Sequence, residues 1–138
     1  MTVLAGRLLR FASAVALWAA PAVDALATGD ILCKAADGSG ASISVGVGHV
    51  PILAVLSARA FDGRRWWSTA ERGKDTAMRF GQGISERGQL RVDFTDVNVT
   101  RTVVSLRLHQ ATVGRSSAMA GILVFADGPV VPVQCIGG

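Results

Sequence analysis

Two cysteines, Cys33 and Cys135, constrain the fold of this chain more than any other feature of its sequence. Each lies in a short apolar run that alternates with period two. Ile31 shares a strand face with Cys33, and Val133 shares one with Cys135, so both sulfurs point where apolar side chains point. We expect a disulfide that joins the first strand of the domain to the last, with two unrelated buried thiols as the alternative.

Residues 1–27 have the features of a secretory signal peptide. Arg7 and Arg10 provide the positive charge near its start. The apolar segment that follows, residues 11–20, is too short to span a bilayer. An uncleaved membrane anchor is the alternative.

Small residues predict cleavage after Ala25 or Ala27, which leaves a single domain over residues 28–138. Export places this domain in an oxidising compartment, where a disulfide persists. We expect that compartment to be the bacterial periplasm.

Composition excludes some classes of protein. Half of the residues are hydrophobic and only 17% are charged, which excludes a disordered chain. Of the 14 basic and 10 acidic side chains, loss of Arg7, Arg10 and Asp24 with the leader leaves 12 and 9, a net charge of +3. This excess is too small and too dispersed for a nucleic-acid-binding surface, but it favours anionic partners.

From residue 30 onward the sequence predicts short strands separated by turns. The alternation is clearest over residues 90–94 and recurs over residues 100–110. Residues 50–61 are apolar on both faces, which predicts a fully buried strand or, alternatively, a helix. We expect an all-β fold, a single antiparallel β-barrel or sandwich of about seven or eight strands, closed by the disulfide between its first and last strands.

Two positions interrupt the alternation. Val97 and Val99 lie on the opposite parity to the strand that follows them, which predicts a bulge or a break near residues 100–103. Pro132 cannot donate a ladder hydrogen bond, which favours an edge position or a bulge there.

The sequence carries no catalytic motif. Its two histidines, His49 and His109, belong to no triad or metal-binding pattern. Asp93 and Asp96 could form a carboxylate pair, but turn capping at a strand end explains them better. Neither cysteine has a second cysteine or a histidine at ligand spacing. We therefore expect no metal, no cofactor and no enzymatic activity.

Arg64, Arg65, Trp66 and Trp67 are the candidate binding residues. Successive residues of a strand point to opposite faces, so one Trp is expected in the core and the other at the surface. An exposed Trp beside arginine is suited to stack on a sugar ring, contact a membrane surface or anchor a protein interface. The alternative is a half-buried Trp under the connection 71–75, with both arginines solvating the turn.

In size, leader, β-only pattern and cysteine placement, the chain resembles the small periplasmic inhibitors of c-type lysozyme over about residues 30–136. The resemblance implies a compact antiparallel barrel that pushes a loop into the cleft of the enzyme. The inhibitory loops of that family carry tyrosine, serine and lysine, whereas this chain has no tyrosine. No site residue is therefore carried over.

Two functions are compatible with these features. The first is a non-catalytic periplasmic protein that binds a protein partner, most concretely as an inhibitor of a cell-wall hydrolase such as lysozyme. The alternative is a binder of an anionic envelope component (lipid, lipopolysaccharide or glycan), with peripheral contact to the membrane. A filled barrel with a protruding loop would favour the first function, and a barrel with a ligand cavity would favour the second.

Overall fold

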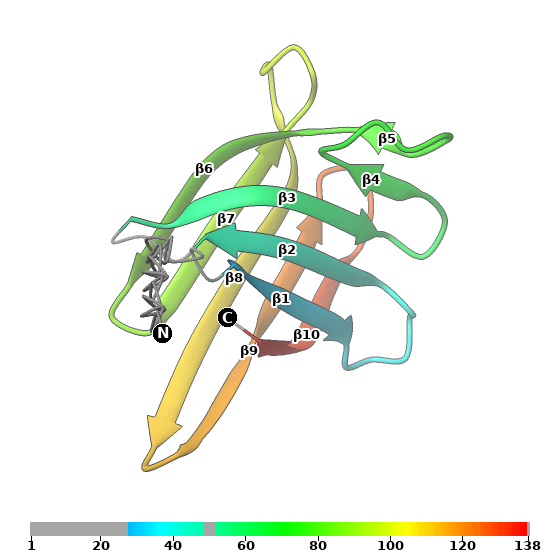
Figure 1. Cartoon of the computed structure of the whole chain (residues 1–138). Coiled ribbons are helices and arrows are strands. Elements are labelled where there is room, and N and C mark those ends of the chain that lie inside the picture. The colour runs from blue at the N-terminus through cyan, green and yellow to red at the C-terminus, as the bar shows by residue number, and fades with distance from the viewer. Residues whose placement is uncertain (1–27, 49–51, 138) are drawn as a thin grey trace, which may run out of the picture.

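A computed structural model describes residues 28–48 and 52–137 of the chain. Over these residues the protein consists of strands, turns and loops without a helix (Figure 1), so the all-β fold is confirmed. The ten strands are β1 Thr28–Ala35, β2 Ser42–Gly48, β3 Ala54–Phe61, β4 Trp66–Ser68, β5 Thr76–Ala77, β6 Arg79–Glu86, β7 Gln89–Thr95, β8 Thr102–Val113, β9 Ser116–Phe125 and β10 Val130–Gly137.

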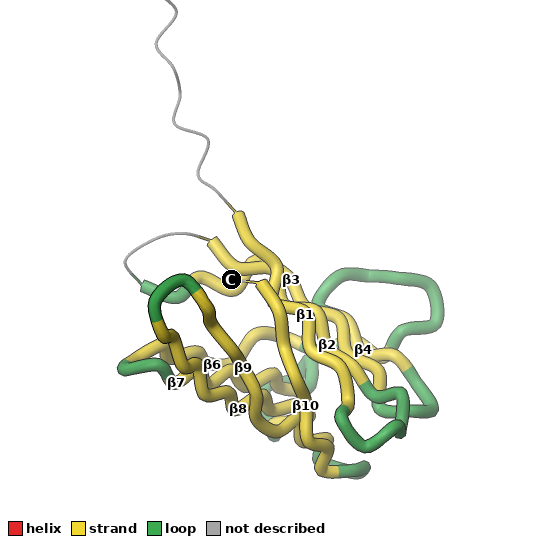
Figure 2. Tube along the Cα trace, turned by 90° about the horizontal axis from the view of Figure 1, so that it is seen from below, coloured by secondary structure: helices red, strands yellow, loops and turns green. Residues whose placement is uncertain are grey.

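The strands form one sheet in the order β5-β4-β3-β2-β1-β10-β9-β8-β7-β6. β1 and β10 pair in the middle of this sheet, where Cys33 lies directly opposite Cys135. Their sulfurs form the expected disulfide across a sequence separation of 102. The sheet curls until β3 approaches β6 (Figure 2), which makes a nearly closed barrel. Among the described residues no ladder joins β3 to β6, and we call this line the seam.

Inward-facing side chains fill the middle of the barrel. The alternation expected over residues 90–94 is confirmed, because Val92 and Phe94 are fully buried and Leu90 is nearly so. β8 buries its inward residues in the same way. The largest fully buried side chains include Phe94, Ile43, Met78, Leu106, Leu108 and Leu123.

The irregularity expected near residues 100–103 is a β-bulge. In the β7–β8 ladder Phe94 pairs with Val104 and Thr95 pairs with Thr102, so Val103 is the extra residue. Val103 and Val104 are consequently both buried, although they are adjacent in the chain.

The edge position expected for Pro132 is wrong, because β10 pairs with β1 on one side and with β9 on the other. The proline lies just beyond the last β1–β10 pair, Ala35↔Val133. Its carbonyl oxygen accepts a hydrogen bond from the amide of Ala36 at 2.8 Å, and its nitrogen points to the same side, past the end of β1. The absent N–H therefore removes no bond from the β1–β10 ladder.

The expected number of strands was too low. Residues 64–70 contain only the short β4. Residues 76–84 divide at the buried Met78 into β5, which pairs with β4 in parallel, and β6, which pairs with β7. The strand predicted over residues 50–61 is not fully buried in its described part. Leu56 is 60% exposed, because it is the extra residue of a β-bulge between the β2–β3 pairs Gly46↔Ser57 and Val47↔Val55.

The disulfide indicates an oxidising, extracytoplasmic compartment, because such bonds are kept reduced in the cytosol. The predicted leader, residues 1–27, lies outside the described residues and stays a prediction. Residues 28–48 and 52–137 include no helix with the length and apolar character that crossing a membrane requires.

Candidate functional site

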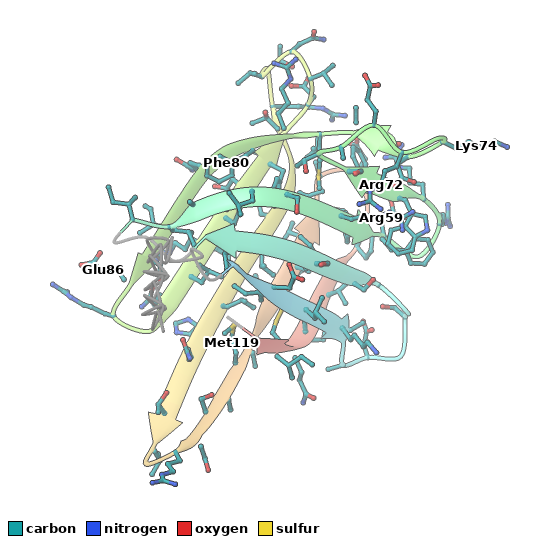
Figure 3. The ribbon with its side chains drawn as sticks, viewed as in Figure 1. Arg59, Arg72, Lys74, Phe80, Glu86 and Met119 are labelled. Atoms are coloured by element: carbon teal, nitrogen blue, oxygen red, sulfur yellow. A yellow bond between two sulfur atoms is a disulfide. The ribbon has the colours of Figure 1, made fainter. Side chains whose placement is uncertain are left out.

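The predicted binding residues, Arg64 to Trp67, lie in the turn after β3 and in β4. Trp67 is 5% exposed and Trp66 is 37% exposed, so the expected division between core and surface is confirmed. Phe61 packs against the ring of Trp66 at a centroid distance of 4.8 Å. The guanidinium of Arg59, which Figure 3 shows near β4, lies 3.9 Å from the centre of that ring.

Asp62 organises the turn that carries these residues. Its carboxylate accepts hydrogen bonds from the backbone amides of Arg64 and Arg65 and from the indole N–H of Trp67. It also pairs with the guanidinium of Arg65, which lies 4.3 Å from the centre of the Trp67 ring. Burial alone would raise the pKa of Asp62, but the hydrogen bonds that it accepts lower that pKa below its ordinary value.

Asp75 neutralises the charge of a second arginine, Arg59, at this end of the barrel. Its carboxylate lies 2.8 Å from Nε and 3.2 Å from Nη2 of Arg59, and this interaction lowers the pKa of Asp75. The connection 71–75 therefore reaches Trp66 through Arg59. Binding by Arg64, Arg65, Trp66 and Trp67 stays a prediction, since acidic groups and packing within the chain already occupy much of this cluster.

A pocket of about 690 Å³ lies at the other end of the barrel, and we call it the mouth. The β2–β3 ladder shows that the two sites lie at opposite ends of the barrel. Ser42 pairs with Phe61 near the predicted binding residues 64–67, whereas Gly48 pairs with Ala54 at the mouth. Lining residues come from β1, β2, β6, β7, β8, β9 and β10 and from the segment before β3. The pocket and the predicted binding residues are therefore far apart on the fold.

The mouth combines an apolar floor with a polar rim. The buried, inward-facing floor residues are Ile31, Val47, Leu90 and Leu108. The polar rim residues are Ser85, Gln89, Gln110 and Ser117. None of the described lining residues carries a charge. The volume lies within the range of about 300–1,000 Å³ that is typical of small-molecule sites.

The β8–β9 hairpin extends past the mouth on one side, as Figure 1 shows. β7 pairs with β8 only as far as His109, and β10 pairs with β9 only as far as Met119. Beyond these residues the described sheet consists of the hairpin alone, up to the pair Val113↔Ser116. Its side chains are exposed, with Val113 82% exposed near the tip.

One of the two histidines lies in the described part of the structure. His109 is exposed on β8, and His49 lies outside the described residues. Within the described ranges, His, Cys, Asp and Glu side chains form no group of three or more that could hold a metal ion.

The two aspartates considered as a pair have separate roles. Asp96 caps the turn after β7 as expected, accepting hydrogen bonds from the amide and the hydroxyl of Thr100. Asp93 was expected to cap the same turn but is buried within β7. Burial raises its pKa, and the hydrogen bonds that it accepts outweigh this effect and lower the pKa. The donors are Gln82, Ser105 and Arg107.

The mouth had no local signature in the sequence. Its lining consists of one to three residues from each of eight segments, and closure of the barrel brings them together. The one available signal was the apolar run that begins at Ile52, because this run contains more apolar side chains than the core buries. Ile52 itself is 79% exposed.

Comparison with protein-family models, curated proteins and solved structures gave no match to this chain.

Proposed function

We propose that the protein is a non-catalytic periplasmic binding protein that holds a small molecule of the cell envelope, with an apolar chain, in the mouth of its barrel. The observation that carries the proposal is the open barrel end with an apolar floor and an uncharged polar rim. A cavity was the feature expected to favour a ligand-binding function over a protein-binding one.

The chemistry of the mouth supports a lipid-like ligand. Burial of an apolar chain against the floor contributes about 25 cal/mol for each Å² of apolar surface removed from water. The amide of Gln110 and the hydroxyls of Ser85 and Ser117 can hydrogen-bond polar groups of the ligand at the rim. A charged group inside the mouth would meet no compensating charge among the described lining residues.

Two adjacent serines of β9 provide a matched test. Ser117 lines the mouth, whereas Ser116 is also exposed but points to the other face of the strand. We expect Ser117→Trp to lower affinity for the neutral fluorophore N-phenyl-1-naphthylamine at least about tenfold by filling the rim, and Ser116→Trp to leave it unchanged. The measurement is fluorescence titration. Equal affinities of the two variants, or no binding by the unmodified protein, would exclude the mouth as a ligand site.

A second candidate function, inhibition of a cell-wall hydrolase such as lysozyme, is favoured by the β8–β9 hairpin. An exposed hairpin that projects beyond the barrel has the shape needed to enter the cleft of an enzyme. Arg115, at its tip, could approach the catalytic carboxylates of a glycosidase.

This candidate predicts that inhibition depends on the hairpin tip. We expect Val113→Asp to raise the inhibition constant against a c-type lysozyme about 30-fold, as for an interface residue worth about 2 kcal/mol. Val130→Asp, at an exposed valine of β10, is the control and should have no effect. The candidate fails if the unmodified protein does not inhibit, or if both variants inhibit equally well.

A further inference from the structure

A second, smaller hollow adjoins the mouth on the side of β6 and β7. Its volume is about 230 Å³. It shares two lining residues, Ile84 and Gln89, with the mouth. The other residues that line it are Glu86, Arg87 and Arg91. Because Leu90 and Val92 face inward, Gln89, Arg91 and the ladder partner Ile84 face outward, so the hollow lies on the outer face of the β6–β7 hairpin. The uncharged pocket and the hollow with two arginines therefore meet across the end of this hairpin.

Arg91 lies on this outer face, two residues after Gln89. Its Nη2 donates a hydrogen bond to Oε1 of Gln89 at 3.1 Å. In the β7–β8 ladder Arg91 lies directly opposite Arg107, and like charges in this position repel each other. Arg107 is compensated, because its Nη2 lies 2.7 Å from the carboxylate of Asp93. The carboxylate of Asp93 already accepts hydrogen bonds from three other side chains, and Arg91 is not among these donors.

Arg87 brings a second positive charge to the hollow from the β6–β7 turn. It adopts a left-handed backbone conformation, with φ of 50°, and Gly88 follows with φ of 73°. Among the described residues, its one ion pair is with the neighbouring Glu86 at 3.5 Å, and both side chains are largely exposed. Exposed pairs of this kind contribute little and are screened by salt. With two arginines and one glutamate, the hollow has a net positive charge.

We propose that the ligand of the mouth is an amphiphile with an anionic head group, whose chain lies in the mouth and whose head reaches over the β6–β7 turn into the hollow between Arg87 and Arg91. The proposal rests on the function proposed above and adds the class of head group. Charge-assisted hydrogen bonds from guanidinium groups suit a carboxylate or a phosphate. A head group bound there also offsets the repulsion between Arg91 and Arg107.

The test compares dodecanoate with 1-dodecanol, which share a chain and differ in the charge of the head group. Each is titrated as a competitor of N-phenyl-1-naphthylamine. We expect the unmodified protein to bind dodecanoate about fivefold more tightly than dodecanol, as for an exposed ion pair worth about 1 kcal/mol. The double variant Arg87→Gln/Arg91→Gln should bind both equally, with its affinity for dodecanol unchanged. The preference of the unmodified protein should also decrease as salt is added.

Arg115→Gln is the matched control, because Arg115 is an exposed arginine of the hairpin tip outside the hollow. This variant should keep the preference for dodecanoate. Equal affinity of the unmodified protein for the two compounds overturns the assignment of the head group, as does a preference that survives in the double variant. Binding of dodecanol, which is uncharged, tests the mouth alone. If neither compound displaces N-phenyl-1-naphthylamine, the proposed function itself fails.

Discussion

Replacement of Cys33 by serine is expected to lower the free energy of unfolding by about 4–5 kcal/mol, because the bond closes a loop of about 100 residues in the unfolded chain. Cys135→Ser should have the same effect, since either change removes the same cross-link, which spans a sequence separation of 102. Urea unfolding of the oxidised protein and of both variants measures these differences. Such a loss is a large fraction of the stability of a domain of this size, about 5–15 kcal/mol.

The reduced, unmodified protein is the control for the serine variants. It should unfold at nearly the same urea concentration as the double variant Cys33→Ser/Cys135→Ser, because both proteins lack the cross-link and keep the β1–β10 ladder. Thiol titration of the native, unreduced protein should find no reactive sulfur, in agreement with the absence of a free cysteine among the described residues. Two reactive sulfurs would contradict the disulfide.

The second large effect is expected from Phe94→Ala, at about 3–5 kcal/mol. Phe94 is 0% exposed and is among the largest fully buried side chains of the barrel. Removal of its ring leaves a cavity in the filled middle of the barrel, and the surrounding strands would have to move to close this cavity. The measurement is again the free energy of unfolding in urea, provided that the slope of the transition is unchanged.

Phe80 is a matched control for Phe94. The two residues are opposite each other in the β6–β7 ladder, with ring centroids 6.4 Å apart in an edge-to-face arrangement. Phe80 is 42% exposed, so Phe80→Ala should cost clearly less, about 1–2 kcal/mol. The double variant should reveal a coupling of about 0.5–1.5 kcal/mol from the pair. Equal costs for the two single variants would mean that the core is centred elsewhere.

The sequence correctly predicted those parts of the fold that depend on the local alternation of apolar and polar residues. Leu90 and Phe94 reveal their face by their spacing, and the parity change after Val99 located the bulge. The division of residues 76–84 at Met78 depends on pairing with two different strands, and no local pattern encodes it. The prediction of a fully buried strand was wrong at Leu56, because a β-bulge leaves this apolar side chain exposed.

The site was less predictable than the fold. Alternation correctly separated Trp66 from Trp67, but it could not show that Asp62 and Asp75 would compensate the nearby arginines. A ligand cavity was considered as an alternative, but its position was not predicted, because serine, glutamine and glycine carry no functional signal until closure of the barrel places them around one opening.

The pairing of β1 with β10 also has a consequence for how fast the protein folds. The sheet consists of two meanders, β1 to β4 and β6 to β10, in which neighbours in sequence pair through short turns. Only the β1–β10 ladder joins residues about a hundred positions apart, and contacts at such separation are slow to form because loop closure must precede them. In the oxidised unfolded chain the disulfide already holds the two strands together at Cys33 and Cys135. The slowest contact of the reduced chain thus becomes a local one, and oxidised protein should refold faster than reduced protein.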